Sequence, residues 1–500
     1  MPKIALHHLT FGFDTNASLL FDHVELTLES QWKLGLVGRN GRGKTTLFNL
    51  LRGRLPYQGT ITGNQHYVYF PATVADPHQS ATAVLQAISP VADWQLEREL
   101  RQLDLDPERL TQPFASLSGG EQTKALLAIL FADDQAYPLI DEPTNHLDLP
   151  SRQRVAAYLR SKRQGFIVVS HDRHFLNQVT DHTLAIERQQ VILYHGNFAV
   201  YEEQKQRRDA FEEERDARLK KEADRLQHVA TDRSNWAKIT ESRTHGNPHE
   251  KNSGWGAVGS STLPAKMMKR ARNLERRRDR ELKATEGLRQ NIEHVTPLTL
   301  TPVATHYQPL LHVADFSLWY GDRQLFQPIS FDLEQGDRLA IIGPNGSGKS
   351  SFLHYLRGTF TGTHTGVAEL KPQLSLSLTR QLSADNHGSL TAFATAHHLD
   401  RNALLNALKK LGLPRDVFHT PLEQMSMGQQ KKVELAQSLI TPANLFIWDE
   451  PLNYLDVFNQ EQLTTLVTTA SPTLLFVEHD QQFVTDVATQ VIELNPKSGK

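Results

Sequence analysis

Four short motifs each occur twice in this chain of 500 residues, in the same order and at almost the same spacing. The two copies lie 305 residues apart at the first motif and 308 residues apart at the other three. Self-similarity at a fixed offset indicates a tandem duplication, so the chain must fold as two related domains. The motif pairs are GRNGRGKTT and GPNGSGKSS (38–46 and 343–351), SLSGGEQ and QMSMGQQ (116–122 and 424–430), IDEPTNHLD and WDEPLNYLD (140–148 and 448–456), and SHD and EHD (170–172 and 478–480).

The first motif of each copy stands between an apolar run and a helical pattern. LGLVG precedes it in one copy and LAIIG in the other, and LFNLLRG or SFLHYLRG follows. A strand, a glycine loop and a helix in this order form a P-loop, whose backbone N–H groups bind phosphates at a helix N-terminus. Apolar runs at 166–169 and 474–477 predict buried parallel strands, and helices are expected near 94–103 and 401–411.

We therefore predict an α/β fold with two tandem P-loop domains, at residues 1–200 and 305–500, joined by a charged helical linker at 201–304. A length of 500 residues suits about three domains of roughly 150 residues each. The chain has no cysteine, which excludes disulfides, thiolate zinc sites and iron–sulfur clusters. No segment approaches the roughly 18 apolar residues of a membrane helix and none resembles a signal peptide, so we expect a cytoplasmic protein without membrane contact of its own.

The P-loops predict binding of ATP with Mg²⁺. Lys44 and Lys349 are expected to reach the β- and γ-phosphates, and Thr45 and Ser350 to place a hydroxyl on the metal. The predicted nucleotide-binding residues of the loops are Gly38, Arg39, Asn40, Gly41, Arg42, Gly43, Lys44, Thr45 and Thr46 in the first copy, and Gly343, Pro344, Asn345, Gly346, Ser347, Gly348, Lys349, Ser350 and Ser351 in the second.

A pair of acidic residues ends an apolar run in each copy. Asp141 and Asp449 suit a carboxylate that holds Mg²⁺ at a strand terminus. The residues that follow, Glu142 and Glu450, are placed to polarise the attacking water, although a solvated acidic turn is the simpler alternative. Pro138 lacks an N–H donor, which predicts that its strand starts there.

A histidine occurs at the matching position of the fourth motif in each copy. His171 and His479 each follow an apolar run and precede an aspartate. A single histidine is usually structural, but a pair at matched spacing predicts a hydrogen bond to the γ-phosphate or to the attacking water.

Together these motifs resemble the ABC ATPase superfamily across both halves of the chain. The resemblance implies that each signature motif offers a helix N-terminus to the nucleotide held by the other half, with ATP joining the halves and hydrolysis releasing them. Phe13 and Tyr320 would stack on adenine, unless they belong to the core. By this resemblance Ser118, Gly119, Gly120 and Glu121 would complete the site at Lys349, and Ser426, Met427, Gly428 and Gln429 the site at Lys44.

The chain departs from the superfamily pattern at two positions that fall on the site around Lys44. The family's Q-loop glutamine, which contacts the metal and nucleotide, corresponds to Gln381 in the second half but to Ala72 in the first. Met427 replaces a signature glycine. We therefore expect two unequal sites, both of which keep their catalytic glutamate.

The linker predicts an antiparallel helical hairpin. Residues 200–238 are rich in Glu, Lys, Arg and Ala and contain no Pro or Gly, which favours one helix of about 55 to 60 Å at roughly 1.5 Å per residue. A second helix is expected at 265–294, and leucine-type residues recur seven apart in both. A segment that breaks any helix lies between them and forms the predicted tip, at about 243–263.

The returning part of the linker is basic. Residues 238–280 hold eleven Lys or Arg against four Asp or Glu, which suits an RNA backbone, although a solvated charged helix would have a similar composition. Trp255 could stack on a base or simply anchor the tip. The candidate RNA-contacting residues are Lys251, Trp255, Lys266, Lys269, Arg270, Arg272, Arg276, Arg277 and Arg278.

Two ABC halves with such a linker resemble the ABC-F proteins of bacterial translation. GRNGRGKT, PLIDEPTNHLDL, GNFAVYEEQK, MSMGQQKKVE and WDEPLNYLDVFN are similar to the Lsa-type antibiotic-resistance members. The resemblance implies binding at the ribosomal E site beside peptidyl-tRNA, and protection of the peptidyl-transferase centre from lincosamides, pleuromutilins and streptogramin A. The alternatives are a housekeeping translation factor, the ATPase subunit of a transporter, and a DNA-repair or chromosome ATPase. Transporter subunits lack a long basic hairpin, and in repair ATPases the coiled coil interrupts a single head.

Overall fold

The computed structural model describes residues 3–13, 19–63, 65–145, 147–187, 189–244, 273, 276, 297–381 and 385–496. It divides into two compact units. Met1–Tyr201 and Thr296–Lys500 form the first unit, and Glu202–Val295 form the second. The first unit contains both expected P-loop domains, which we call the first half (3–201) and the second half (297–496). The domain boundaries expected from the sequence remain predictions.

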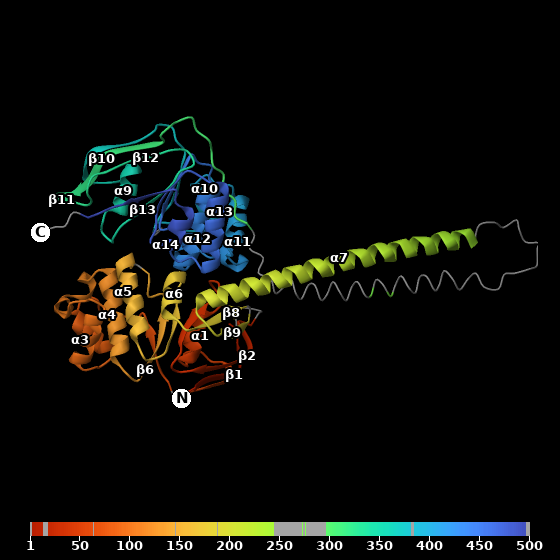
Figure 1. Ribbon diagram of the computed structural model, residues 1–500, viewed down its shortest axis with the longest axis horizontal. Helices are drawn as coiled ribbons and strands as arrows, with labels where there is room; N and C mark the ends of the chain where they lie inside the picture. The colour runs from red at the N-terminus through yellow and green to blue at the C-terminus, as the bar shows by residue number, and fades with distance from the viewer. Residues whose placement is uncertain are drawn as a thin grey trace, which may run out of the picture. The chain divides into compact units, whose positions relative to one another are not determined.

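The first half contains two sheets among its described residues, and its elements run from red to yellow in Figure 1. The larger has the strand order β5-β6-β7-β3-β8-β9, in which only β9 is antiparallel to its neighbour. The smaller is antiparallel, with the order β2-β1-β4. The strands are β1 (Lys3–Phe11), β2 (Phe21–Glu29), β3 (Lys33–Val37), β4 (Gln58–Thr62), β5 (His66–Phe70), β6 (Ala136–Asp141), β7 (Phe166–Val169), β8 (His182–Glu187) and β9 (Gln190–Tyr194).

Helices of the first half follow the strands in the alternating order of an α/β fold. The expected helix at 94–103 is α3, displaced by one residue at each end. The helices are α1 (Lys44–Leu51), α2 (Ala81–Ile88), α3 (Asp93–Gln102), α4 (Gly119–Ala132), α5 (Leu149–Ser161) and α6 (Arg173–Val179), with the short 3-10 helices η1 (Pro107–Thr111) and η2 (Phe114–Ser116).

The second half repeats this plan, in green to blue in Figure 1. Its described parallel sheet has the order β15-β16-β17-β13-β18, and an antiparallel sheet is built around β10, which pairs with β11, β12 and β14. The strands are β10 (Leu311–Tyr320), β11 (Arg323–Gln324), β12 (Ile329–Leu333), β13 (Arg338–Ile342), β14 (Thr363–Leu370), β15 (Leu376–Thr379), β16 (Leu445–Asp449), β17 (Leu474–Val477) and β18 (Gln490–Glu493). The helices are α9 (Lys349–Leu356), α10 (Leu390–Ala396), α11 (Arg401–Lys410), η3 (Arg415–His419), η4 (Leu422–Gln424), α12 (Met427–Ile440), α13 (Val457–Ala470) and α14 (Gln481–Val487).

Strands β7 and β17 are buried on both faces of their sheets, as their continuous apolar sequences predict. All four residues of each strand are buried. Successive side chains of β7 alternate between two core clusters: Phe166 and Val168 pack in one, and Ile167 and Val169 in the other. The expected α/β architecture with two tandem P-loop domains is therefore confirmed.

The expectation that Pro138 starts its strand is wrong. Pro138 is the third residue of β6, which lies between β5 and β7. It pairs with Val68 of β5, but the pairing of β6 with β7 begins only at Leu139. The missing N–H of Pro138 is tolerated because β6 is not yet paired with β7 at this position.

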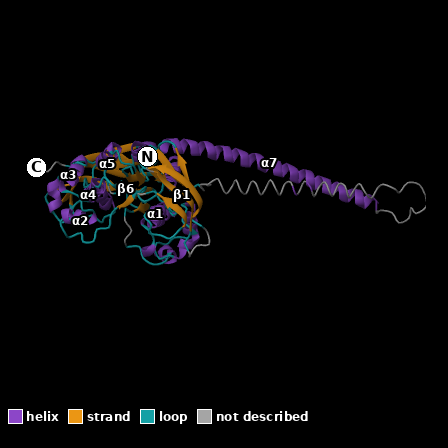
Figure 2. Cartoon of the chain, turned by 90° about the horizontal axis from the view of Figure 1, so that it is seen from below, coloured by secondary structure: helices purple, strands orange, loops and turns teal. Residues whose placement is uncertain are grey.

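Helix α7 (Phe198–Thr244) begins at the end of the first half and extends six residues beyond the 200–238 helix that the sequence predicts. Its 47 residues correspond to a length of about 70 Å at roughly 1.5 Å per residue. Figure 2 shows α7 as one unbroken helix. Phe198 and Tyr201 are buried in the core of the first half, so the helix starts from a fixed point.

Most of the remaining linker predictions lie outside the described residues. This applies to the second helix at 265–294, the tip at 243–263 beyond Thr244, and the hairpin that the two helices would form. Of the nine candidate RNA-contacting residues, only Arg276 is described, and it is helical and exposed. Lys251, Trp255, Lys266, Lys269, Arg270, Arg272, Arg277 and Arg278 lie outside the described residues. Within the described part of the chain, no helix has the length and apolar character needed to cross a membrane.

A buried carboxylate joins α3 to α5 and gives a stability prediction. Glu99 is 2% exposed; it accepts a hydrogen bond from the Tyr158 hydroxyl at 2.7 Å and pairs with Lys162 and Arg98. Glu99→Ala should lower the free energy of unfolding by about 3 to 5 kcal/mol, because it leaves the largely buried Lys162 ammonium without its partner. Urea unfolding followed by circular dichroism measures the change.

The matched control is Glu97→Ala on the same helix. The Glu97 side chain is about half exposed and lies 3.8 Å from Arg101, so its loss should change stability by less than about 0.5 kcal/mol. Equal effects of the two substitutions would contradict the role given to Glu99.

Candidate active sites

Each P-loop connects a central strand to a helix, and its last glycine is required by the geometry. The loops run from β3 to α1 and from β13 to α9. Gly43 and Gly348 immediately precede the lysines and have φ values of 97° and 91°. A Cβ at Gly43 would lie 2.8 Å from Leu20, and one at Gly348 would lie 3.0 Å from Leu325. Only glycine therefore fits both the backbone conformation and the space.

The P-loop lysines lie across their own loops. Lys44 Nζ donates to the carbonyl of Gly38 at 2.7 Å and to Asn40 Oδ1 at 3.1 Å. Lys349 Nζ donates to the carbonyls of Gly343 and Pro344, both at 2.9 Å. Burial lowers the pKa of each ammonium, and the neighbouring acidic residues partly oppose that shift. Both cations are thus held where the phosphates of a nucleotide would bind.

In both halves a hydroxyl and a carboxylate meet at the end of the P-loop. Thr45 Oγ1 donates to Asp141 Oδ2 at 3.0 Å, and Ser350 Oγ donates to Asp449 Oδ1 at 3.4 Å. These are hard oxygen ligands of the kind that Mg²⁺ prefers, and Mg²⁺ takes its remaining ligands from water and phosphate. The residues present therefore fit the metal. No group of three or more His, Cys, Asp or Glu side chains that could hold a metal without phosphate occurs among the described residues.

The two candidate catalytic glutamates share a strained backbone conformation. Glu142 and Glu450 have φ values of 52° and 46°, in the left-handed region that non-glycine residues rarely adopt. Each N–H donates at 2.9 Å to the neighbouring strand, Glu142 to Val169 and Glu450 to Val477. Such strain persists where a side chain must be held in one direction, which is common at functional sites.

Each glutamate lies beside the histidine of its half. His171 Nε2 is 3.2 Å from Glu142 Oε1, and His479 Nε2 is 3.7 Å from Glu450 Oε1. Burial lowers the pKa of His171 and lowers that of His479 to about 3, so both rings are neutral at physiological pH. Burial and the adjacent Asp141 raise the pKa of Glu142 to about 8, which suits an acid–base group that acts near neutral pH.

Residues of both halves line one cavity of about 630 Å³ around Lys44. Phe13, Thr45, Glu142 and His171 come from the first half. The second half contributes its complete signature segment, Ser426, Met427, Gly428 and Gln429, together with Tyr454 and Lys432. The structure thus brings together the P-loop and the signature motif that the sequence pairs at this site.

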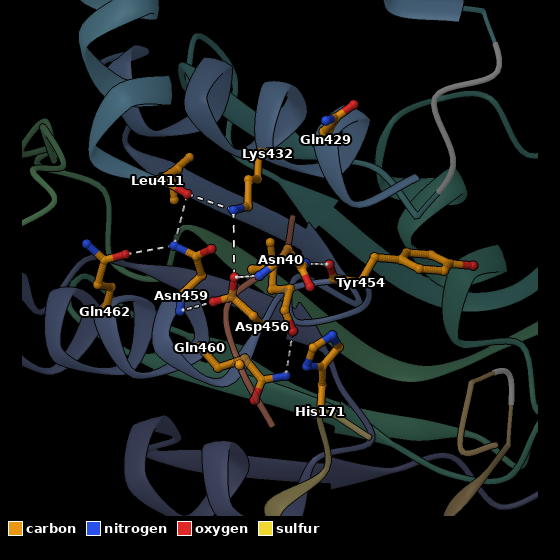
Figure 3. Close-up of polar contacts among 12 residues, drawn as sticks. Asn40, His171, Leu411, Gln429, Lys432, Tyr454, Asp456, Asn459, Gln460 and Gln462 are labelled. Atoms are coloured by element: carbon orange, nitrogen blue, oxygen red, sulfur yellow. Dashed lines mark hydrogen bonds and ion pairs between the residues drawn. The ribbon is translucent and has the colours of Figure 1, made fainter. Parts of the chain in front are cut away.

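The halves are connected directly at the P-loops, as Figure 3 shows for the first site. The Asn40 N–H donates to Asp456 Oδ2 at 2.9 Å, and Asn40 Nδ2 donates to the Tyr454 carbonyl at 3.1 Å. At the second site the Asn345 N–H donates to Asp148 Oδ2 at 3.3 Å. The two aspartates are the last residues of the repeated motif, and the sequence analysis gives them no role. Their repetition at matched spacing is the signal that could have identified them.

Both signature serines cap a helix. Ser118 precedes α4 and accepts from the Glu121 N–H at 3.3 Å, and Ser426 precedes α12 and accepts from the Gln429 N–H at 3.4 Å. These helix N-termini offer partial positive charge to an anion. For Ser426 the helix faces the Lys44 cavity. The pairing of Ser118, Gly119, Gly120 and Glu121 with Lys349 stays a prediction.

The residues expected to make the sites unequal differ in their surroundings. Met427 is the first residue of α12, is 43% exposed and lines the Lys44 cavity. Gln381 Nε2 donates to Glu450 Oε2 at 2.7 Å, whereas Ala72 packs against the hydrophobic core. Of the two candidate adenine-stacking residues, Phe13 lines the Lys44 cavity, and Tyr320 ends β10 against Phe360.

The second site also contains two buried ionisable side chains that the sequence prediction missed. Lys431 Nζ donates to the carbonyls of Asp449 at 3.0 Å and Arg380 at 2.8 Å. Glu478 accepts from the N–H groups of His479 at 2.7 Å and Leu452 at 3.1 Å. Counted from the motifs, the first half has Thr123 and Ser170 at these positions. A comparison of the two sequence copies at these positions could therefore have identified Lys431 and Glu478.

The fold and these sites define a tandem P-loop ATPase whose P-loops face the opposite half. A family model described as ABC transporter matches residues 21–145 and 326–453. The chain therefore belongs to the ABC family, as an ABC-F ATPase with two ABC domains that hydrolyses ATP.

Relatives of this chain match almost its whole length. It is 27% identical over 477 residues to the ribosome protection protein VmlR of Bacillus subtilis (95% of this chain, 83% of the relative). It is 28% identical over 516 residues to the ATP-binding protein Uup of Caulobacter vibrioides (100% of this chain, 78% of the relative). It is 23% identical over 521 residues to ABC transporter F family member 5 of Arabidopsis thaliana (92% of this chain, 71% of the relative). An archaeal ribosome recycling factor, aABCE1, solved in complex with the ribosomal stalk protein aP1, shares the fold with a TM-score of 0.63 at 18% identity (99% of this chain, 88% of that chain).

Glu478 gives a pH-dependent prediction for the second site. Burial raises its pKa from 4.5 to about 7 in the folded protein. Below pH 4.5 the buried, protonated Glu478 makes its full contribution to the free energy of unfolding. That contribution falls as the pH rises from 4.5 to about 7, and about 3 kcal/mol is lost. The Gln side chain of Glu478→Gln cannot ionise, so the variant does not lose this contribution. The difference in unfolding temperature, variant minus natural protein, should therefore rise between pH 5 and pH 8. A pH-independent difference would contradict the buried-acid interpretation.

Proposed function

We propose that this ABC-F ATPase is a ribosome-protection protein of the cytoplasm. It would bind the ribosomal E site beside peptidyl-tRNA and protect the peptidyl-transferase centre from lincosamide, pleuromutilin and streptogramin A antibiotics, as Lsa-type proteins do. The observation that carries the proposal is the match to VmlR, named a ribosome protection protein, over 95% of this chain. That match includes both ATPase halves and the linker between them.

The energy for this action would come from ATP and Mg²⁺ bound between the halves. At the first site Lys44 would neutralise the phosphates, Thr45 and Asp141 would hold the metal, and the helix that Ser426 caps would face the γ-phosphate. Mg²⁺ would polarise the phosphate oxygens when bound. Glu142 would then orient and deprotonate the attacking water, with the neutral His171 beside it.

The second site would use the corresponding residues. Lys349 would bind phosphate, Ser350 and Asp449 would hold the metal, and Glu450 with His479 would act on the water. With nucleotide in both sites the halves would be joined, and hydrolysis would remove the γ-phosphate that each signature helix faces. The contact between the P-loops and Asp148 and Asp456 supports a cycle of this kind, because it makes each site sensitive to the position of the other half.

The linker would make the contact with RNA. Helix α7 starts in the core of the first half, and the basic segment returns toward the second half along the chain. Lysine and arginine at this density would neutralise rRNA phosphates. The tip at 243–263, with Trp255, would approach the peptidyl-transferase centre, where drug displacement takes place.

A housekeeping role in translation is the second candidate, because the ATP-binding protein Uup matches the complete chain. In that case the protein would act on peptidyl-tRNA without conferring resistance. Expression in a drug-sensitive strain separates the two roles, since only a protection protein should raise the inhibitory concentration of lincomycin or tiamulin. An ATPase subunit of a transporter is less well supported, and stable co-purification with a membrane protein would favour it.

The double substitution Glu142→Gln with Glu450→Gln should trap the ATP-bound protein on ribosomes. It removes the general base from both sites and keeps their shape, so hydrolysis should fall at least about 100-fold while ATP still binds. Sucrose-gradient sedimentation with ATP would show the variant in the ribosomal fractions.

The matched control is Lys44→Ala with Lys349→Ala, which should sediment free of ribosomes because it cannot bind nucleotide. If the glutamine variant also remains at the top of the gradient with ATP present, the ribosome proposal is wrong.

Deletion of residues 246–263 should abolish drug protection and leave ATP hydrolysis within about twofold of the natural rate. The deleted segment lies in the linker, and the ATP sites described above do not include it. Inhibitory concentrations and phosphate release, measured on the same variant, separate the two activities. Unchanged resistance after the deletion would remove the tip from the mechanism.

A further inference from the structure

The metal-binding carboxylate of the first site receives a second hydroxyl that the motifs do not include. The Tyr69 hydroxyl donates to Asp141 Oδ2 at 3.0 Å, and Thr45 Oγ1 donates to the same oxygen at 3.0 Å. Tyr69 is the fourth residue of β5, which is the neighbour of β6, the strand that ends at Asp141. Asp141 is thus fixed both by the P-loop helix and by the adjacent strand.

The strand register identifies the equivalent residues of the second half. Tyr69 is paired with Leu139, two residues before Asp141, and Leu378 is paired with Ile447, two residues before Asp449. Leucine therefore stands where the first half has tyrosine. By the same register Ala72 corresponds to Gln381.

In the second half, the counterpart of Tyr69, Leu378, lines a cavity. A cavity of about 330 Å³ lies beside Asp449 and Ser350, and Leu378 and Gln381 are among the residues that line it. Gln381 reaches the catalytic Glu450 from this side, at 2.7 Å. At the first site a tyrosine, Tyr69, thus donates to the acidic pair, at Asp141. At the second site a glutamine, Gln381, donates to it, at Glu450.

The Tyr69 ring is held firmly enough to place its hydroxyl. The Arg52 guanidinium lies over one face, 4.9 Å from the ring centroid, and Phe48 meets the ring edge to face at 6.1 Å. These contacts on the ring fix its direction, so that the hydroxyl lies 3.0 Å from Asp141 Oδ2 as the donor.

We propose that Tyr69 is the positioning residue of the first metal site, where it orients Asp141 and supplies polar support that the missing Q-loop glutamine cannot. A group that hydrogen-bonds a metal-binding carboxylate fixes its direction, and removal of such a group typically weakens metal binding 10- to 100-fold. Tyr69 would act through Asp141 and would not touch the metal. This inference rests on the proposed Mg²⁺ site.

The test is Mn²⁺ binding in the presence of the non-hydrolysable nucleotide AMP-PNP, measured by electron paramagnetic resonance on the full chain. Lys349→Ala with Ser350→Ala disables the second site, so that the signal reports the first. In this background Tyr69→Phe should weaken Mn²⁺ binding about tenfold. The phenyl ring keeps the contacts with Arg52 and Phe48, so a packing role alone would leave Mn²⁺ binding unchanged.

Tyr67→Phe is the matched control on the same strand. The Tyr67 hydroxyl is buried and has no hydrogen-bond partner among the described residues, so its loss should leave Mn²⁺ binding unchanged. A second control places Tyr69→Phe in a chain whose first site is disabled by Lys44→Ala with Thr45→Ala. The binding that remains belongs to the second site, and it should be unaffected.

The outcomes separate this inference from the metal proposal. If Mn²⁺ does not bind even when Tyr69 is present, the metal proposal itself fails. If Mn²⁺ binds equally with tyrosine and with phenylalanine, the metal site stands and the positioning role of Tyr69 is overturned. An equal loss in the Tyr67→Phe chain would also overturn it, because the effect would then not be specific to the hydroxyl that reaches Asp141.

Discussion

A hydrogen bond between the P-loop of one half and a carboxylate of the other is the contact on which this architecture depends. The Asn40 N–H donates to Asp456, and the Asn345 N–H donates to Asp148. Each aspartate follows the candidate catalytic glutamate of its own half by six residues in sequence. The geometry of each P-loop is therefore connected to the catalytic segment of the opposite site. These contacts help to place the signature helix capped by Ser426 opposite Lys44.

The two sites that result are related by duplication, but they are not equivalent. The first has Tyr69 on the carboxylate proposed to bind the metal, a methionine in the facing signature, and neutral residues at positions 123 and 170. The second has Gln381 on its glutamate and two further buried ionisable side chains, Lys431 and Glu478. Burial lowers the pKa of Lys431 to about 8, and the acidic groups around it oppose that shift. The second site therefore holds two buried ionisable side chains whose counterparts in the first half, Thr123 and Ser170, cannot carry a charge.

The sequence was sufficient for the fold because its signals are periodic or repeated. Continuous apolar runs placed the central strands, and the glycines before Lys44 and Lys349 marked turns that only glycine can form. The repeat also located the acidic pair and the histidine of each half. The prediction for Pro138 failed because β6 begins to pair with β5 and with β7 at different residues. The periodicity of a sequence gives no information on where such pairing starts. Tyr69 was missed for a related reason, since a tyrosine in an apolar strand gives no sign of which carboxylate its hydroxyl will reach.

In the proposed cycle, the contact between the halves must be strong enough to align a site and weak enough to break at each turnover. Asp456 satisfies both conditions because it also has partners inside its own half: the Asn459 N–H donates to it at 2.9 Å, and Lys432 Nζ lies 3.9 Å away. Although burial alone would raise the pKa of Asp456, these groups and Asn40 hold it below the usual value, so the carboxylate stays charged. When the halves separate, Asp456 loses the hydrogen bond from Asn40 but is not left as an unpaired buried charge. The same holds for Asp148, which keeps the Ser151 N–H at 3.1 Å. Opening would break the hydrogen bonds from Asn40 to Asp456 and to the Tyr454 carbonyl at the first P-loop, and the bond from Asn345 to Asp148 at the second. Each bond to a charged acceptor contributes roughly 1 to 3 kcal/mol.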